Sequence, residues 1–137
     1  MGYYASMPAP PTIRALLDVL YDKYDITLPL EDLFIWGTDQ DWHSDLKTGT
    51  RVGYAHINGQ DADQYAFREK GVDWQIWIAQ GDKPLPLRVV INSTDDPARP
   101  QFEANLTWNT APQFSADTFT FTPPADAKAI VIETSTR

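Results

Sequence analysis

Apolar residues recur with two different periods along the chain, and the change falls near residue 50. In the first part, the stretch "PAPPTIRALLDVLYDKYDITLP" has the i, i+3, i+4, i+7 spacing of an amphipathic helix that Thr12 can cap; its apolar positions are Ile13, Leu16, Leu17, Leu20 and Tyr24. A second helical turn is predicted from Pro29, because Leu30, Leu33 and Phe34 share a face. Helical segments between about residues 11 and 36 are therefore expected, and they need an apolar surface to lie on.

After Thr50 the period becomes two, which predicts strands over residues 50–58, 63–70, 72–79, 86–93, 101–109, 117–122 and 128–134. The connections carry turn-forming pairs: Asn58-Gly59, Lys70-Gly71, Gly81-Asp82, Asp96-Pro97 and Pro123-Pro124. Connections this short permit antiparallel hairpins and leave no room for parallel crossovers. The chain, residues 1–137, is predicted to be a single α+β domain in which helices precede an antiparallel meander.

The alternation assigns side chains to the two faces of the predicted sheet. One face is continuously apolar and should be covered by the helix: Tyr65, Phe67, Val72, Trp74, Ile76, Ile78, Leu87, Val89, Ile91, Phe102, Ala104, Leu106, Trp108, Phe119 and Phe121. The other face suits water: Asp73, Gln75, Arg88, Asn92, Gln101, Glu103, Asn105 and Thr107. Trp77 and Val90 are its exceptions, and we expect them to shield each other across neighbouring strands.

Composition excludes several classes of function. The net charge is −8, from 11 basic and 19 acidic residues, so a nucleic-acid partner is not expected. Cysteine is absent, which excludes a disulfide framework and a thiolate metal site. No apolar run of about 18 residues is present, and the start, "MGYYASMPAPPT", lacks the regions of a signal peptide. If the protein is exported, its signal is expected to have been removed.

Candidate catalytic and metal-binding residues are few. The stretch "DQDWHSD" spaces Asp39, Asp41, His43 and Asp45 like half of a calcium loop, but Ser44 and Thr50 stand where that loop needs glycine and glutamate. A solvated acidic loop is therefore the favoured interpretation. His43 and His56 are the only histidines, so a multi-histidine zinc site is excluded. We expect no enzyme, no catalytic residue, no metal and no cofactor.

Two arginines lie beside the tryptophan-rich stretch. Arg68 and Arg88 could contact an anionic head group or stack on Trp77 or another ring. An ordinary surface ion pair with Asp73 or Glu69 is the commoner role for such residues.

The stretches "AFREKGVDWQIWIAQGDKPLPLRVVI", "PQFEANLTWN" and "FTFTPPADAKAI" resemble a family of predicted periplasmic bacterial proteins of unknown function in the lipoprotein-carrier (LolA/LolB-like) superfamily. The likeness is most specific over about residues 64–130. It implies a periplasmic location and a curved antiparallel β-sheet, an incomplete β-barrel whose open side is covered by helices. It also implies an apolar cavity between sheet and lid, which in the carriers accommodates acyl chains.

The chain departs from the resembled family in two places. Asp126 stands in a turn where relatives usually have glycine, and we expect the turn to survive because aspartate tolerates the left-handed region. Relatives also carry further strands before the helical segment, so this chain is expected to be a fragment of a longer carrier-like domain. A half-barrel exposes a strand edge and part of its apolar lining, which predicts a homodimer, unless the strands curl enough to close the core alone.

The predicted ligand site is the set of apolar residues that would line the cavity: Leu16, Leu20, Tyr24, Trp74, Ile76, Leu106, Trp108, Phe119 and Phe121. The alternative is that these residues fill the core and leave no cavity. The first functional hypothesis is a non-enzymatic carrier of a hydrophobic small molecule or a lipoprotein acyl chain, with peripheral membrane contact. The second is a structural module that dimerises through its open edge or apolar face.

Overall fold

A computed structural model of the chain describes residues 2–35 and 46–135. They form two compact units, one of residues 2–35 with 113–135 and one of residues 46–112. The positions of the units relative to each other are not determined, so each is described by itself. The expectations of a single domain and of helices that cover the sheet therefore stay predictions.

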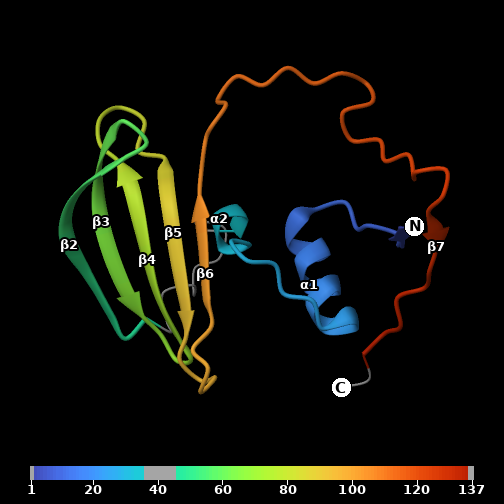
Figure 1. Ribbon diagram of the computed structural model, residues 1–137, viewed down its shortest axis with the longest axis horizontal. Coiled ribbons are helices and arrows are strands. Elements are labelled where there is room, and N and C mark those ends of the chain that lie inside the picture. The colour runs from blue at the N-terminus through green and yellow to red at the C-terminus, as the bar shows by residue number, and fades with distance from the viewer. Residues whose placement is uncertain (1, 36–45, 136–137) are drawn as a thin grey trace. The chain divides into compact units, whose positions relative to one another are not determined.

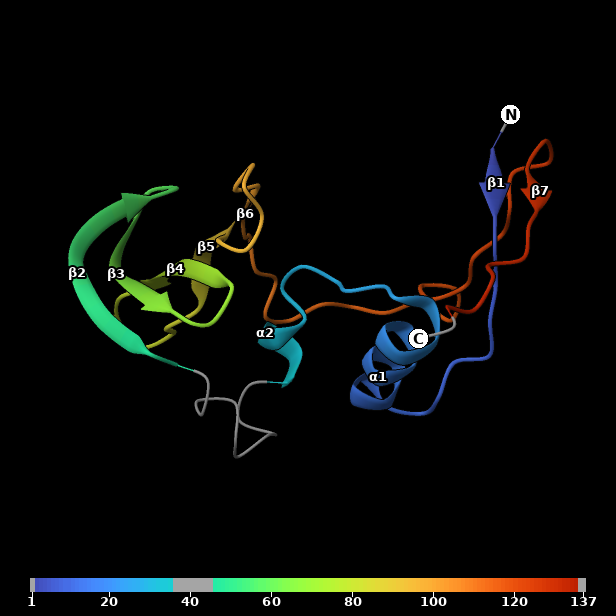
Figure 2. The same cartoon turned by 90° about the horizontal axis from the view of Figure 1, so that it is seen from below.

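Residues 46–112, the sheet unit, contain a five-stranded antiparallel sheet (Figure 1). Its strands are β2 (Thr48–Ile57), β3 (Gln60–Arg68), β4 (Val72–Ala79), β5 (Pro86–Ser93) and β6 (Gln101–Asn105), and each pairs with its neighbour in sequence. The predicted α+β class is confirmed, and so is the antiparallel meander over its first five strands. The sheet is curved, as Figure 2 shows, but β2 and β6 remain its two edges and it does not close into a barrel.

The hairpin turns follow the turn chemistry of the sequence. Ile57 pairs with Gln60, so Asn58 and Gly59 form a two-residue loop, with φ of 50° and 79°. Both values lie in the left-handed region that a twisted hairpin of this length requires, and asparagine and glycine reach that region at low cost. Because the strands are antiparallel, this turn and the β4–β5 connection lie at the same end of the sheet.

The register divides the side chains between two faces. Phe67, Trp74, Ile91 and Phe102 lie on one, the Trp74 face, because they are directly opposite one another on successive strands. The other, the Trp77 face, holds a buried cluster of Ala62, Trp77, Ala79, Leu87 and Val90, against which Ala55 and Ile57 pack. None of the eight residues predicted to face water is buried, but the cluster includes Ala62, Ala79 and Leu87 besides the two predicted exceptions. Ala62 and Ala79 have small side chains, which leave space for the Trp77 ring.

The other unit contains the helices. Helix α1 (Ile13–Tyr24) begins as predicted, since the Thr12 hydroxyl accepts a hydrogen bond from the Ala15 amide at 3.2 Å. It ends at Asp25, which is left-handed with φ of 55°. The shorter helix α2 (Asp32–Ile35) follows, close to the predicted second helical turn. Within the described ranges, no helix is long and apolar enough to cross a membrane.

The last two predicted strands are largely absent. Residues 117–122 form no strand: the Ser115 amide donates to the Thr118 hydroxyl at 2.8 Å, the Ser115 hydroxyl donates to the Asp117 carboxylate at 2.6 Å, and a turn results. The predicted strand 128–134 is reduced to β7 (Lys128–Ala129), which pairs with β1 (Tyr3–Tyr4). That pairing is parallel, so the expectation of antiparallel pairing alone is also wrong. The two paired strands come from opposite ends of the described chain.

Candidate functional site

Trp77 is the largest side chain of the buried cluster, and residues on the neighbouring strand cover its ring. It is 8% exposed, and Arg88 lies directly opposite it on β5. The Arg88 guanidinium carbon is 5.0 Å from the centre of the Trp77 ring, and its Nη2 donates to Glu103 at 2.9 Å. Of the two roles considered for Arg88, the less favoured one, stacking on Trp77, is present. Arg88 also forms an ion pair, but with Glu103, so the favoured pairing with Asp73 or Glu69 is wrong for this residue. Val90 packs in the same cluster but lies opposite Gln75, so the predicted direct pairing with Trp77 is wrong.

A register shift places Leu87 at the end of this cluster. Trp77 pairs with Arg88, whereas the next residue, Ile78, pairs with Pro86, so Leu87 is an extra residue on β5. Leu87 is 3% exposed and packs with Trp77 and Ala79. The bulge thus moves Leu87 from the Trp74 face, where the alternation had predicted it, to the Trp77 side.

A hollow of about 310 Å³ adjoins Leu87 at the end of the sheet that carries the Asn58 turn. We call it the end pocket, and it is lined by Asn58, Gln60, Lys83, Leu85, Leu87, Leu106, Thr107, Trp108 and Thr110. The lining comes from the β2–β3 hairpin, the β4–β5 connection, the start of β5 and the segment after β6. Strands β4 and β5 separate β3 from β6 in the sheet, so the curvature brings these segments to one hollow.

Two hydrogen bonds hold the segment after β6 against β5. The Leu106 amide donates to the Leu87 carbonyl at 2.8 Å, and the Trp108 indole Nε1 donates to the Pro86 carbonyl. Since its only polar group is satisfied in this way, the Trp108 ring, 45% exposed, presents apolar surface to the pocket. Leu85, Leu87 and Leu106 supply the rest of the apolar wall.

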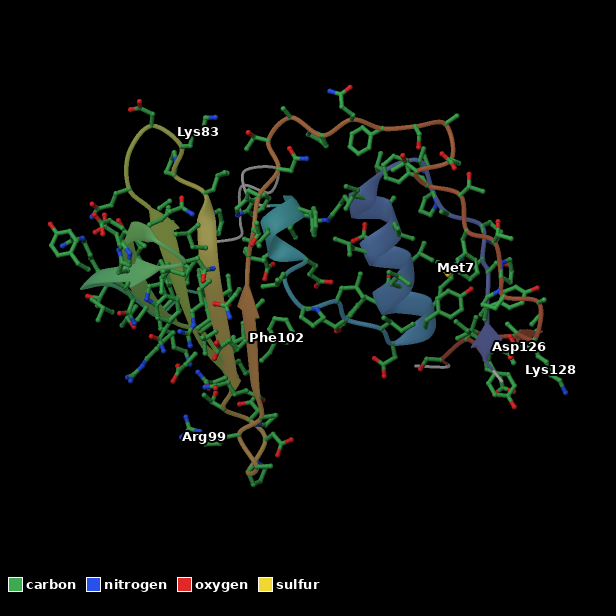
Figure 3. The ribbon with its side chains drawn as sticks, turned by 45° about the horizontal axis from the view of Figure 1, so that its top comes forward. Met7, Lys83, Arg99, Phe102, Asp126 and Lys128 are labelled. Carbon is green, nitrogen blue, oxygen red and sulfur yellow. The ribbon has the colours of Figure 1, made fainter. Side chains whose placement is uncertain are left out.

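The polar lining of the end pocket contains one positive charge and no negative charge among the described residues. Lys83 is the one cation among the described lining residues, and none of them is a carboxylate. Arginines on the strands are paired: Arg51 with Asp63 at 2.6 Å and Arg68 with Asp73 at 3.7 Å. No ion pair or side-chain hydrogen bond engages Lys83 within residues 2–35 and 46–135. Figure 3 shows Lys83 on the β4–β5 connection, with Phe102 toward the other end of the sheet.

The nine predicted site residues are divided between the two units. Leu106 and Trp108 line the end pocket. Trp74 and Ile76 lie on the Trp74 face of β4, where Trp74 stacks on Phe67 at 4.1 Å. The others are in the helical unit: Leu16, Leu20, Tyr24, Phe119 and Phe121. Of these, Leu16, Leu20 and Tyr24 are half-buried, whereas Phe119 and Phe121 are 85% and 70% exposed.

A second hollow of about 310 Å³ lies beside Trp74. It contains the Arg68–Asp73 ion pair, and the Trp74 indole donates to Glu69 at 2.6 Å. Its charged groups are thus already satisfied by one another. The predicted pairing of Arg68 with Asp73 is confirmed.

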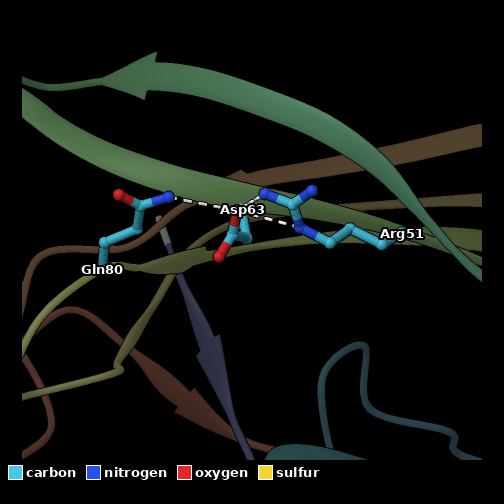
Figure 4. A network of polar contacts seen from close by, with 3 residues as sticks. All are labelled: Arg51, Asp63 and Gln80. Atoms are coloured by element: carbon cyan, nitrogen blue, oxygen red, sulfur yellow. Dashed lines mark hydrogen bonds and ion pairs between the residues drawn. The ribbon is translucent and has the colours of Figure 1, made fainter.

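A polar network at the β2 edge joins three segments of the sheet (Figure 4). The Asp63 carboxylate accepts from Arg51 Nη2 at 2.6 Å and from Gln80 Nε2 at 3.1 Å. These hydrogen bonds, that from Arg51 above all, lower the pKa of Asp63 and keep it ionised. His56 forms a hydrogen bond at 2.9 Å with Asp61, the residue directly opposite it on β3. These pairs link neighbouring strands of the sheet.

The acidic stretch that was compared with a calcium loop is not among the described residues. Asp39, Asp41, His43, Ser44 and Asp45 lie outside the described residues. Within residues 2–35 and 46–135, no group of three or more histidine, aspartate or glutamate side chains is placed to hold a metal ion.

Comparison with known proteins identifies the family. The family DUF2092, described as "Predicted periplasmic protein (DUF2092)", matches residues 1–133. No curated protein and no solved structure matches the chain. The periplasmic location expected from the sequence agrees with this description. The chain therefore belongs to DUF2092, a family of predicted periplasmic proteins.

Proposed function

We propose that the protein is a non-catalytic, carrier-like periplasmic domain that binds a lipid or another hydrophobic molecule in the end pocket. One observation carries the proposal: the end pocket has a wall of three leucines and Trp108 beside the buried Trp77 cluster. Ligand sites are usually concave, mostly apolar hollows of about 300–1,000 Å³ with a few placed polar groups. At about 310 Å³ the end pocket is at the lower limit of that range.

The architecture supports the same proposal. An open, curved antiparallel sheet is what an incomplete barrel of the LolA/LolB-like carriers would contain, and we propose that relation for this chain. In such a carrier the ligand would be bound reversibly by burial of apolar surface, which is worth about 25 cal/mol for each Å² removed from water.

Dye displacement and extraction test this function. An apolar fluorescent dye such as N-phenyl-naphthylamine should bind saturably and be displaced by decanol. Denaturing extraction followed by mass spectrometry should release a hydrophobic molecule from the purified protein. Trp108→Ala should weaken dye binding about tenfold, since it removes a large part of the apolar wall.

Phe102→Ala is the matched control. Phe102 is an exposed aromatic residue on β6 that does not line the end pocket, so its substitution should leave dye affinity unchanged. The proposal is wrong if no saturable dye site exists and no hydrophobic molecule is extracted.

A structural module that dimerises is the second candidate. Its support is the β2 edge strand, ten residues long, on which Val52 and Tyr54 are 54% and 76% exposed. The register shift between Arg51 and Gly53 weighs against it, because a bulge disturbs the edge that a second copy would pair with. Analytical ultracentrifugation tests it: a concentration-independent monomer excludes dimerisation through this edge.

A further inference from the structure

We infer that the end pocket takes a single-chain amphiphile with an anionic head, such as a fatty acid, and that Lys83 binds the head. This deepens the proposed function and rests on it. The inference depends on the charge of the pocket lining, which differs in sign from the chain as a whole.

The end pocket differs in charge from the chain as a whole. The chain has 19 acidic and 11 basic residues, yet the described lining of the end pocket contains Lys83 and no carboxylate. An unpaired ammonium beside apolar walls lies in a locally lower dielectric, where attraction to an anion is stronger than in bulk water. A cationic head group would be disfavoured there for the same reason.

The lining of the end pocket also contains amide and hydroxyl side chains. Among the described residues, no side-chain hydrogen bond engages Asn58, Gln60, Thr107 or Thr110. These amides and hydroxyls can donate to head-group oxygens beside Lys83. The backbone of Lys83 is fixed by the Leu85 amide, which donates to the Lys83 carbonyl at 2.8 Å. The cation is therefore attached to a defined turn at the pocket rim.

Size limits the apolar part of the ligand. A volume of about 310 Å³ accommodates one short alkyl chain and not the two chains of a phospholipid. Leu85, Leu87, Leu106 and Trp108 provide the walls for that chain. The chemical class is thus a monoanionic amphiphile with one chain.

Binding of three ten-carbon probes to the intact protein tests the inference, followed by Trp fluorescence and calorimetry. Decanoate should bind more tightly than decanol, and decyltrimethylammonium more weakly than either. High salt should weaken decanoate binding and leave decanol binding unchanged, because it screens an exposed charge pair. Decyl phosphate distinguishes a phosphate head group from a carboxylate. If it binds as tightly as decanoate, the ligand class includes phosphates; if it binds more weakly than decanoate, the class is restricted to carboxylates.

Lys83→Gln should weaken decanoate binding about threefold to fivefold, the range of a partly exposed ion pair, and leave decanol binding unchanged. Asp82→Asn changes an adjacent charge that does not line the pocket, so it should cause no loss of decanoate affinity. The inference is overturned if Lys83→Gln binds decanoate as tightly as the unmodified protein does. If decanol binds but the head group makes no difference, the proposed function stands and this inference falls; if no probe binds, both fall.

Discussion

The sheet unit and the helical unit both contain large hydrophobic residues, but the exposed fractions of these side chains differ greatly between the units. In the sheet unit Trp77 is 8% exposed and Ile76 is 2% exposed, whereas in the helical unit Phe119 and Val131 are 85% and 89% exposed. All the hydrophobic residues that are fully buried in the described chain belong to the sheet unit. In this chain, alternating apolar residues form a core only where neighbouring strands complete the sheet.

Backbone hydrogen bonding explains the difference. Each of β3, β4 and β5 has a partner on both sides, so its amides and carbonyls are satisfied within the sheet. In "TFTFTPP" the alternation is just as regular, but Pro123 and Pro124 have no amide to donate, and the Thr118 hydroxyl accepts from the nearby Ser115 amide. The same pattern therefore gives a strand in one unit and a turn in the other.

The largest expected effect comes from removing a large side chain in each unit. Trp77→Ala should lower the free energy of unfolding by about 3 kcal/mol, because it leaves a cavity among Ala62, Leu87 and Val90. Phe121→Ala should change it by less than about 0.5 kcal/mol, since Phe121 is 70% exposed. Urea unfolding followed by circular dichroism measures both. Equal losses would contradict the contrast between the units.

A smaller effect is expected from one added methyl group. Gly71 has φ of 82°, and a Cβ there would meet the Asp95 carboxylate, so Gly71→Ala should cost about 1–2 kcal/mol. Gly2, in the helical unit, has nothing within 4 Å of such a Cβ, and Gly2→Ala should have no measurable cost. Thermal unfolding of the two variants compares them, and a stable Gly71→Ala protein would show that this turn tolerates rearrangement.

Much of the fold was predictable because its contacts are local in sequence. The turn at Asn58-Gly59 and the cap at Thr12 each depend on two or three adjacent residues, and the structure confirms both. The parallel pairing of β1 with β7 was not predictable, since it joins Tyr3 to Lys128 across almost the whole chain. The periodicity of a strand predicts which face of the sheet each residue lies on, but it does not predict which other strand will pair with it.

The end pocket was only partly predictable. Leu106 and Trp108 were included in the predicted site because they are large and apolar. Lys83 and Asn58 were missed, although a signal existed: both belong to predicted turns that antiparallel pairing puts at the same end of the sheet. Leu87 was assigned to the wrong face because a bulge, which periodicity does not reveal, inserts it as an extra residue.

The smallest expected effect is a change in acid sensitivity. Hydrogen bonding from Arg51 lowers the folded-state pKa of Asp63 below its ordinary value of 3.8. Its contribution to stability is therefore complete above pH 3.8 and is lost as the pH falls through the lower, folded pKa. Asp63→Asn should lose less of its stability than the unmodified protein between neutral pH and that acidic range, as urea unfolding at the two pH values would measure. Asp82→Asn is the control, because it makes the same change of charge and leaves the Arg51–Asp63 hydrogen bond in place. If this variant loses as little stability on acidification as Asp63→Asn does, net charge and not the Arg51–Asp63 pair determines the loss of stability in acid.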